Sequence, residues 1–312
     1  PLVKGIAPIM QAQLIETALL NIINHQSLIA TKTERIVYAA KGDGVMEFGL
    51  RRAQGPDAGT YGARAAMIAG CIGTSNVLCG KMFDVPVKGT HAHSWIMSFP
   101  DELTAFRTYA KLYPSACILL VDTYDTLGSG VPNAIQVFKE MREAGIPLTF
   151  YGIRLDSGDL AYLSKKAKKM LNEAGFPDAV ISASNDLDEN LINSLKMQGA
   201  TINSWGVGTN LITAKDCPSF GGVYKLAAVM DKATGQFVPK IKLSENAEKI
   251  TNPGNKTIQR IYDKATGKII ADLICLVGEE FDTRNSLLLF DPLETWKKTM
   301  LAPDSYTMRE LM

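Results

Sequence analysis

The sequence predicts an α/β protein in which parallel strands joined by helices form a barrel, the arrangement we prefer, or an open sheet. The main observation is that short apolar runs alternate with helix-like segments in units of about thirty residues, the pattern of parallel βα units. Glycine and then proline follow two predicted helix ends, at residues 145–147 and 175–177, as such units require. Beyond Gly221 shorter strand-like runs predict a mostly β region.

The predicted elements follow one another along the α/β part. Apolar residues at three- and four-residue spacing predict a leading helix between Gln11 and Ala40. Apolar runs predict strands at Val45–Phe48, Cys117–Val121, Leu148–Ile153, Ala179–Ser182 and Thr201–Val207. Helical patterns between them lie at Ala58–Ile72, Asp101–Leu112, Asn133–Ala144, Leu160–Ala174 and Asp188–Gln198. Ser98 and Asp101 are spaced as a capping box for the second of these helices.

The last part of the chain is predicted to contain β-hairpins. Residues 231–235 and 263–267 share the sequence Asp-Lys-Ala-Thr-Gly, and each copy lies between strand-like runs. We therefore expect an α/β-barrel core at residues 1–250, with its leading helix in residues 1–40. A partial flanking region with a hairpin is expected at residues 251–312.

Composition narrows the classes of function. The 312 residues are 46% hydrophobic, which is enough to bury a sizeable core. Lysine and arginine (33) nearly cancel aspartate and glutamate (32), so the broad positive surface of a nucleic-acid binder is not expected. The five cysteines lack metal-binding or disulfide spacing, and no apolar run approaches the roughly 20 residues of a membrane span. We therefore expect a cytoplasmic protein with no nucleic-acid or membrane partner.

Polar side chains directly follow the predicted strands, where the carboxyl ends of parallel strands build a site. Asp122 and Asp125 follow one strand, and Arg154, Asp156 and Asp159 follow the next. Neighbouring carboxylates can hold Mg²⁺ through their oxygens, and strand-end aspartates can also accept hydrogen bonds from ribose hydroxyls. The alternative is that Asp122, Asp125 and Asp159 only cap the helices that follow them.

Small residues after the later strands predict a seat for a phosphate. Gly206-Val207-Gly208-Thr209 and Ser184-Asn185 offer backbone N–H groups near helix starts. This segment lacks the lysine of a P-loop and the spacing of a dinucleotide fingerprint. After the first strand, Phe48 and Arg51 are spaced to stack on a flat ring and to pair with an anion. The alternative there is a core phenylalanine beside solvated arginines.

Two of the three histidines lie two residues apart, in the segment Gly89-Thr90-His91-Ala92-His93-Ser94. An imidazole can exchange a proton near neutral pH, ligate a metal or accept a phosphoryl group. One possibility is therefore a metal hydrolase in which His91 and His93 share a metal. That possibility is the weaker one, because the third histidine, His25, lies on the predicted leading helix.

Seven stretches together carry a resemblance to a known family; they are residues 47–54, 74–77, 89–94, 120–126, 152–159, 183–189 and 205–209. In this order the chain resembles nicotinate phosphoribosyltransferase, from Pro1 to at least Lys249. The resemblance implies an irregular, TIM-like α/β barrel with a partial, mostly β flanking domain, and a homodimer with active sites near the subunit interface. Full-length relatives extend beyond both ends, so it also implies missing segments, as does the absence of an initial methionine.

The resemblance also implies the reaction. Nicotinate displaces pyrophosphate from C1 of phosphoribosyl pyrophosphate, which gives nicotinate mononucleotide for NAD biosynthesis. Mg²⁺ assists, and ATP is a co-substrate whose hydrolysis is coupled through a phosphohistidine.

Carried over position by position, the resemblance assigns roles to individual residues. His93 matches the phosphorylated histidine, whereas His91 falls at a variable position. Asp122 and Asp125 match the acidic pair near the pyrophosphate and Mg²⁺. The remaining matches are Phe48 and Arg51 for the pyridine ring, Arg154 and Asp156 for the phosphoribosyl group, and Ser184, Asn185, Gly208 and Thr209 for the 5′-phosphate.

Ser75 stands where the related nicotinamide enzymes carry an aspartate. An aspartate can accept a hydrogen bond from a carboxamide but would repel the carboxylate of nicotinate, so a serine favours the acid. Within the same fold, the alternatives are a nicotinamide or quinolinate phosphoribosyltransferase. From a different class, the alternative is a truncated fragment that binds a phosphoribosyl group without turnover.

Overall fold

The computed structural model describes residues 2–245, 250–291 and 293–311. The chain forms two compact units, one of residues 18–222 and one that combines the residues up to Thr17 with those from Val223 onward. This division differs from the boundary that we expected at residue 250. Strands β7 (Ala228–Met230) and β8 (Phe237–Pro239), which form a separate two-stranded sheet, belong to the second of these units.

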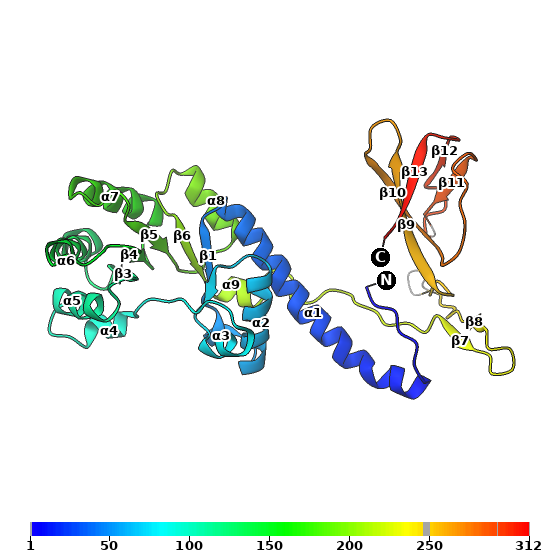
Figure 1. Cartoon of the computed structure of the whole chain (residues 1–312), viewed down its shortest axis with the longest axis horizontal. Helices are drawn as coiled ribbons and strands as arrows, with labels where there is room; N and C mark the ends of the chain where they lie inside the picture. The colour runs from blue at the N-terminus through cyan, green and yellow to red at the C-terminus, as the bar shows by residue number, and fades with distance from the viewer. Residues whose placement is uncertain (1, 246–249, 292, 312) are drawn as a thin grey trace. The chain divides into compact units, whose positions relative to one another are not determined.

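The unit of residues 18–222 is built on a sheet of six strands in the order β2-β1-β6-β5-β4-β3. Every neighbouring pair is parallel, and the sheet curls as a half-barrel flanked by helices (Figure 1). The predicted α/β class with parallel strands is therefore confirmed. The strands are β1 (Gly44–Glu47), β2 (Gly73–Thr74), β3 (Cys117–Leu120), β4 (Tyr151–Leu155), β5 (Val180–Ala183) and β6 (Ser204–Val207).

Helices connect these strands as the βα pattern predicts. They are α1 (Ile9–Ala40), α2 (Pro56–Ile68), α3 (Val77–Phe83), α4 (His93–Met97), α5 (Glu102–Leu112), α6 (Val131–Glu143), α7 (Leu160–Glu173), α8 (Glu189–Met197) and α9 (Thr209–Ile212). A 3-10 turn, η1 (Leu50–Arg52), follows β1, and a π-helical turn, η2 (Thr126–Gly130), precedes α6. Within the described part of the chain, no helix combines the length and apolarity that crossing a membrane requires.

Aspartate side chains begin several of these helices. Asp101, Asp159 and Asp188 each accept a hydrogen bond from the backbone N–H three residues on, which satisfies a donor that the helix itself leaves unpaired. The capping box expected at Ser98 is wrong, because Asp101 is itself the cap of α5. The Ser98 hydroxyl instead donates to the carbonyl of Trp95 at 2.7 Å.

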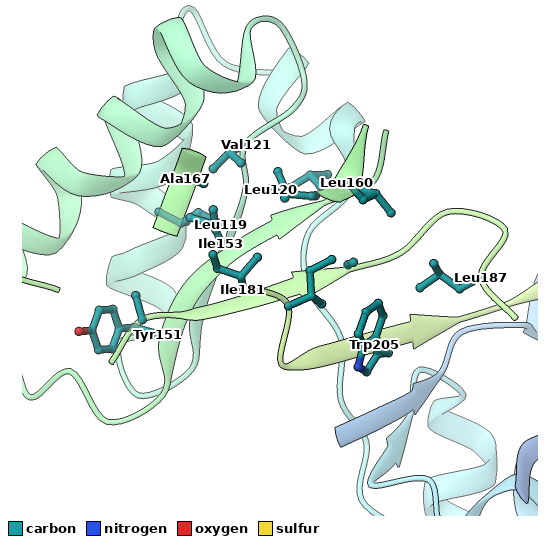
Figure 2. Close-up of a cluster of buried hydrophobic side chains, with 14 of the residues drawn as sticks. Leu119, Leu120, Val121, Tyr151, Ile153, Leu160, Ala167, Ile181, Leu187 and Trp205 are labelled. Atoms are coloured by element: carbon teal, nitrogen blue, oxygen red, sulfur yellow. The ribbon is translucent and has the colours of Figure 1, made fainter. Parts of the chain in front are cut away.

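Alternation along the strands separates the hydrophobic core from the functional face. Leu119, Ile153 and Ile181 are register partners on neighbouring strands, and their buried side chains lie together in the core (Figure 2). Successive side chains of a strand point to opposite faces of the sheet. Leu120 and Arg154, one residue further on, are therefore presented to the other face, and both line a cavity there.

The second unit contains antiparallel sheets, as the mostly β prediction requires. One sheet has the order β10-β9-β13, and strands β11 and β12 form another pair. The strands are β9 (Lys256–Asp263), β10 (Ile269–Leu276), β11 (Leu287–Phe290), β12 (Lys298–Leu301) and β13 (Tyr306–Leu311). Ile261, Leu301 and Tyr306 form its buried cluster.

Both predicted hairpin turns are confirmed and have the same construction. The Oδ1 atoms of Asp231 and Asp263 accept hydrogen bonds from the backbone N–H groups two and three residues on. Gly235 and Gly267 then adopt φ angles of 69° and 68°, a left-handed conformation that costs glycine little. The shared sequence thus encodes the same turn in two places.

Gly130 provides a test of packing at the end of β3. A Cβ atom built on Gly130 would lie 1.9 Å from the backbone oxygen of Val121. We expect Gly130→Ala to lower the free energy of unfolding by about 2 kcal/mol, because the backbone must shift to remove the clash. Urea unfolding followed by tryptophan fluorescence measures this. Gly221→Ala is the control, since no atom lies within 4 Å of its Cβ position; equal stability of both variants would contradict the analysis.

Candidate active site

A cavity of about 420 Å³ lies at the carboxyl ends of the parallel strands. Its walls come from the segments that follow β1, β2, β4, β5 and β6, together with the loop before α4. Parallel strands bring these segments to one edge of the sheet although they are far apart in sequence. The predicted site residues that line it are Phe48, Arg51, Ser75, His93, Arg154, Asp156, Ser184, Asn185, Gly208 and Thr209.

The guanidinium group of Arg154 is fixed by three side chains. Its Nε donates to the Ser184 hydroxyl, one terminal nitrogen to the Thr90 hydroxyl and the other to the Asp156 carboxylate, each at 2.8 Å. The Ser184 hydroxyl also contacts the Asp156 carboxylate through a short hydrogen bond. A cation held in a planar, multiply bonded geometry presents a fixed positive face to a phosphate or pyrophosphate.

Asp156 remains an anion because of these neighbours. Burial alone would raise the pKa of its carboxyl group. The hydrogen bond from Ser184 and the charge and hydrogen bond of Arg154 outweigh burial and hold the pKa below its ordinary value, with a smaller contribution from His93. The cavity therefore contains a carboxylate that stays ionised at neutral pH.

His93 begins α4 and is paired with Asp122. The Nε2 atom of His93 lies 3.1 Å from Oδ1 of Asp122. The other carboxylate oxygen of Asp122 accepts hydrogen bonds from the backbone N–H of Asp156 at 2.9 Å and from the Ser157 hydroxyl at 2.6 Å. The Asp122 side chain is 1% exposed whereas that of His93 is 39% exposed, so the buried carboxylate orients a ring that a ligand can reach.

Neither aspartate of the expected pair lines the cavity among the described residues. Asp122 bonds to His93, which does line it, whereas Asp125 caps η2 by accepting the backbone N–H of Gly128 at 2.8 Å. The capping alternative thus describes Asp125 and Asp159, but not Asp122. Over residues 2–245, 250–291 and 293–311, no three His, Cys, Asp or Glu side chains are grouped to hold a metal ion.

His91 also borders the cavity but is committed to the core. Its Nε2 accepts the backbone N–H of Leu120 at 3.3 Å, and its ring packs edge-on against Tyr109, with centroids 4.5 Å apart. Burial lowers the pKa of His91 to about 4. Because this nitrogen is occupied, His91 does not join His93 in a shared metal site of the kind a hydrolase would need.

An aromatic wall forms beside β1. The Phe48 ring lies 5.9 Å from the guanidinium carbon of Arg154. A Cβ atom on Gly206 would lie 2.6 Å from this ring, so the ring has its place only because residue 206 has no side chain. Arg51, in η1, and Ser75, after β2, are exposed on the same cavity. A flat ring can therefore lie against Phe48 with a guanidinium group in reach of an anionic substituent.

The segment after β5 has a strained backbone. Asn185 and Asp186 adopt φ angles of 94° and 39°, values that favour glycine and cost most other residues energy. The buried amide of Asn210 stabilises this segment by donating to the carbonyls of Asp186 at 2.8 Å and Leu187 at 3.0 Å. This turn and the Gly208-Thr209 step form the small-residue end of the cavity.

Several contributors were not predicted as site residues. Thr90, Arg52 and Asp186 line the cavity, and Glu47 lies buried outside it. Thr90 could have been suspected from its place beside His91. Glu47 begins the first stretch that carries the family resemblance, but the sequence does not indicate which groups its carboxylate contacts.

Two protein-family models match this sequence. The model of the nicotinate phosphoribosyltransferase (NAPRTase) family matches residues 44–265. A second model, of the nicotinate phosphoribosyltransferase C-terminal domain, matches residues 255–312. Together the two matches include every residue that lines the cavity.

Individual proteins of known family are also similar to this chain. Nicotinate phosphoribosyltransferase of Bacillus subtilis (strain 168) is 53% identical over 296 residues, which cover 95% of this chain and 59% of that protein. The protein of the same name from Dictyostelium discoideum is 40% identical and covers 88% of this chain and 53% of its own length. The crystal structure of human nicotinic acid phosphoribosyltransferase superposes with a TM-score of 0.77 at 29% identity, over 98% of this chain and 67% of that one. The chain thus spans little more than half the length of these two curated relatives.

The buried His91 predicts how stability depends on pH. In the unfolded chain its ordinary pKa is 6.5, whereas in the folded chain it is about 4, so between these values only the unfolded state takes up the proton. Stability should therefore fall as the pH drops through this window. In His91→Gln the amide oxygen can still accept the Leu120 N–H. Between pH 7 and 4.5 we expect the free energy of unfolding of this variant to fall by about 2 kcal/mol less than that of the wild type. Urea unfolding at both pH values measures the difference; parallel losses would contradict the assignment.

Proposed function

Because this chain belongs to the nicotinate phosphoribosyltransferase family, we propose that it joins nicotinate to phosphoribosyl pyrophosphate and releases nicotinate mononucleotide and pyrophosphate. The observation that carries the proposal is the fixed arrangement of Arg154, Asp156 and Ser184 in one cavity with His93, which the buried Asp122 orients. In this set Arg154 can bind an anion, Asp156 can stabilise a cation and His93 can accept a phosphoryl group.

In the proposed complex each end of the cavity holds one part of the substrates. The backbone of the Ser184-Asn185 turn and of Gly208-Thr209 surrounds the 5′-phosphate. Arg154 and Asp156 contact the phosphoribosyl group. The nicotinate ring stacks on Phe48, and its carboxylate pairs with Arg51.

The proposed transfer breaks one bond and forms one. The ring nitrogen of nicotinate attacks C1 of the ribose with its lone pair, and the C1–oxygen bond to pyrophosphate breaks with its electrons going to the leaving oxygen. Positive charge develops on the ribose as negative charge develops on pyrophosphate. The ionised Asp156 stabilises the former and the guanidinium of Arg154 the latter, because both are held in place before the charges appear.

ATP enters the proposal through His93. The Asp122 carboxylate accepts a hydrogen bond from Nε2 of His93. The ring proton is therefore on Nε2, and Nδ1 keeps a lone pair. Nδ1 is therefore the proposed acceptor of the γ-phosphoryl group, and ADP is the leaving group. Subsequent hydrolysis of the phosphohistidine would favour product formation.

Mg²⁺ was expected at Asp122 and Asp125, and the arrangement of these residues does not fit a direct two-aspartate site. The Asp122 oxygens already accept three hydrogen bonds, and Asp125 caps η2. The steps proposed above therefore use only side chains of this chain. The homodimer and the cytoplasmic location stay predictions.

One assay separates the proposed activity from its alternatives. The full chain is incubated with phosphoribosyl pyrophosphate and with nicotinate, nicotinamide or quinolinate, in the presence and absence of ATP. The proposal is supported if nicotinate gives nicotinate mononucleotide while nicotinamide and quinolinate give no product. Preference for another base contradicts it. Binding of phosphoribosyl pyrophosphate without any product, detected as thermal stabilisation, identifies the non-catalytic alternative.

His93 has a specific expected phenotype. We expect His93→Ala to abolish phosphoenzyme formation and ATP coupling while some ATP-independent transfer remains, because the substrate contacts do not include His93. Labelling with γ-³²P ATP and acid-lability of the product measure this. His91→Gln is the matched control and should keep the label, since His91 Nε2 is occupied by Leu120. An acid-labile phosphate retained on His93→Ala would reject the assignment.

Ser75 should determine whether the site prefers nicotinate or nicotinamide. We expect Ser75→Asp to raise the KM for nicotinate at least tenfold, because a carboxylate at this wall repels the carboxylate of nicotinate. Ser75→Ala removes the hydroxyl without adding charge and serves as the control. Steady-state kinetics with nicotinate and nicotinamide give the comparison, and unchanged nicotinate kinetics in Ser75→Asp would sink the idea.

A further inference from the structure

Glu47 is a fully buried carboxylate behind the wall of the cavity. It ends β1 with 0% exposure and does not line the cavity. Since neighbouring strand residues point to opposite faces, it lies on the face opposite to that of Phe48. No lysine or arginine of the described residues forms an ion pair with it. A buried carboxylate without a cation is costly, so it depends on hydrogen bonds.

Each oxygen of Glu47 accepts one hydrogen bond, and the two donors belong to different walls of the cavity. One oxygen accepts the backbone N–H of Gly49 through a short hydrogen bond, and the other accepts the Thr74 hydroxyl at 2.6 Å. Gly49 precedes η1, which carries Arg51, and Thr74 precedes Ser75. Burial raises the pKa of Glu47, and the hydrogen bonds from Thr74 and Gly49 oppose that rise.

The connection continues beyond Thr74. Its hydroxyl oxygen also accepts the backbone N–H of Asn76 at 3.0 Å, and the Asn76 side chain caps α3 by accepting the N–H of Cys79 at 3.0 Å. Thr74 and Asn76 are as buried as Glu47. One chain of hydrogen bonds therefore runs from the segment after β1 to the start of α3.

The carboxylate adds to a short stretch of backbone pairing. β2 has two residues, and its register with β1 rests on Met46 with Gly73 and Glu47 with Thr74. The backbone N–H of Ser75 also donates to the carbonyl of Glu47 at 3.0 Å, and the backbone of Thr74 is bonded to Pro86 and Lys88. The segment after β1 is closely packed, since a Cβ atom on Gly49 would lie 2.5 Å from Ile212. The Glu47 side chain thus adds a second connection between two segments that the backbone already pairs.

We propose that Glu47 is a positioning residue that, through Gly49 and Thr74, sets the distance between the Phe48–Arg51 wall and Ser75, and so the width of the subsite for the flat ring. The inference rests on the proposed function for the identity of the ring. It assigns Glu47 no contact with substrate. Arg154 and Ser184, at the phosphoribosyl end of the cavity, take no part in these hydrogen bonds.

The test breaks the connection at Thr74 and compares the two substrates. Thr74→Val keeps the volume and removes the hydroxyl, and we expect it to raise the KM for nicotinate about tenfold while kcat and the KM for phosphoribosyl pyrophosphate stay within about twofold. Thr74→Ser keeps the hydroxyl and should restore the wild-type KM. Thr33→Val is the matched control, because the Thr33 hydroxyl is also buried but has no hydrogen-bond partner within the described residues.

The results separate the inference from the proposed function. An unchanged nicotinate KM in Thr74→Val, or an equal rise for both substrates, would overturn the positioning role. If Thr74→Val does not fold, Thr74→Cys, whose thiol is a weaker donor, takes its place. Amide hydrogen exchange gives a readout without turnover: Thr74→Val should speed exchange at residues 49–52 and 75–77 relative to wild type and Thr33→Val. A wild type that makes no product would reject the proposed function, and the exchange comparison would still decide the inference.

Discussion

The guanidinium of Arg154 donates to three side chains from three separate segments: Thr90 before α4, Asp156 after β4 and Ser184 after β5. Asp156 is largely buried and keeps its charge because of Arg154 and Ser184. The backbone N–H of Asp156 in turn holds Asp122, which orients His93. The histidine, the carboxylates and the phosphate end of the cavity are therefore parts of one hydrogen-bonded assembly, and Arg154 is where its branches meet.

Much of this could be read from the sequence because it follows from strand ends. Polar residues directly after apolar runs predicted most of the cavity, and the parallel sheet brought them together as expected. The two hairpin turns were equally predictable, since their hydrogen bonds lie within five residues of chain. Predictions succeeded where the interaction is local or where the topology of parallel strands determines the neighbours.

The failures share another cause. Asp122 and Asp125 both follow β3, yet one faces His93 and the other caps η2, because the hydrogen bond to Gly128 competes locally for Asp125. The two donors to Glu47, Gly49 and Thr74, are identified only in the structure. In each case the deciding hydrogen-bond partner is identified only by the three-dimensional arrangement.

The contact between Gly206 and Phe48 has a consequence for redesign of the pocket. The ring occupies the volume that a side chain at position 206 would take, so the identities of the two positions are not independent. Replacing Phe48 by a smaller residue would free space next to β6 as well as inside the cavity, and a larger substrate could use that space only while position 206 stays glycine. Libraries that aim to widen the range of accepted bases should therefore vary both positions together. A single change at position 206 creates a clash with Phe48, and a single change to a smaller residue at position 48 leaves a void.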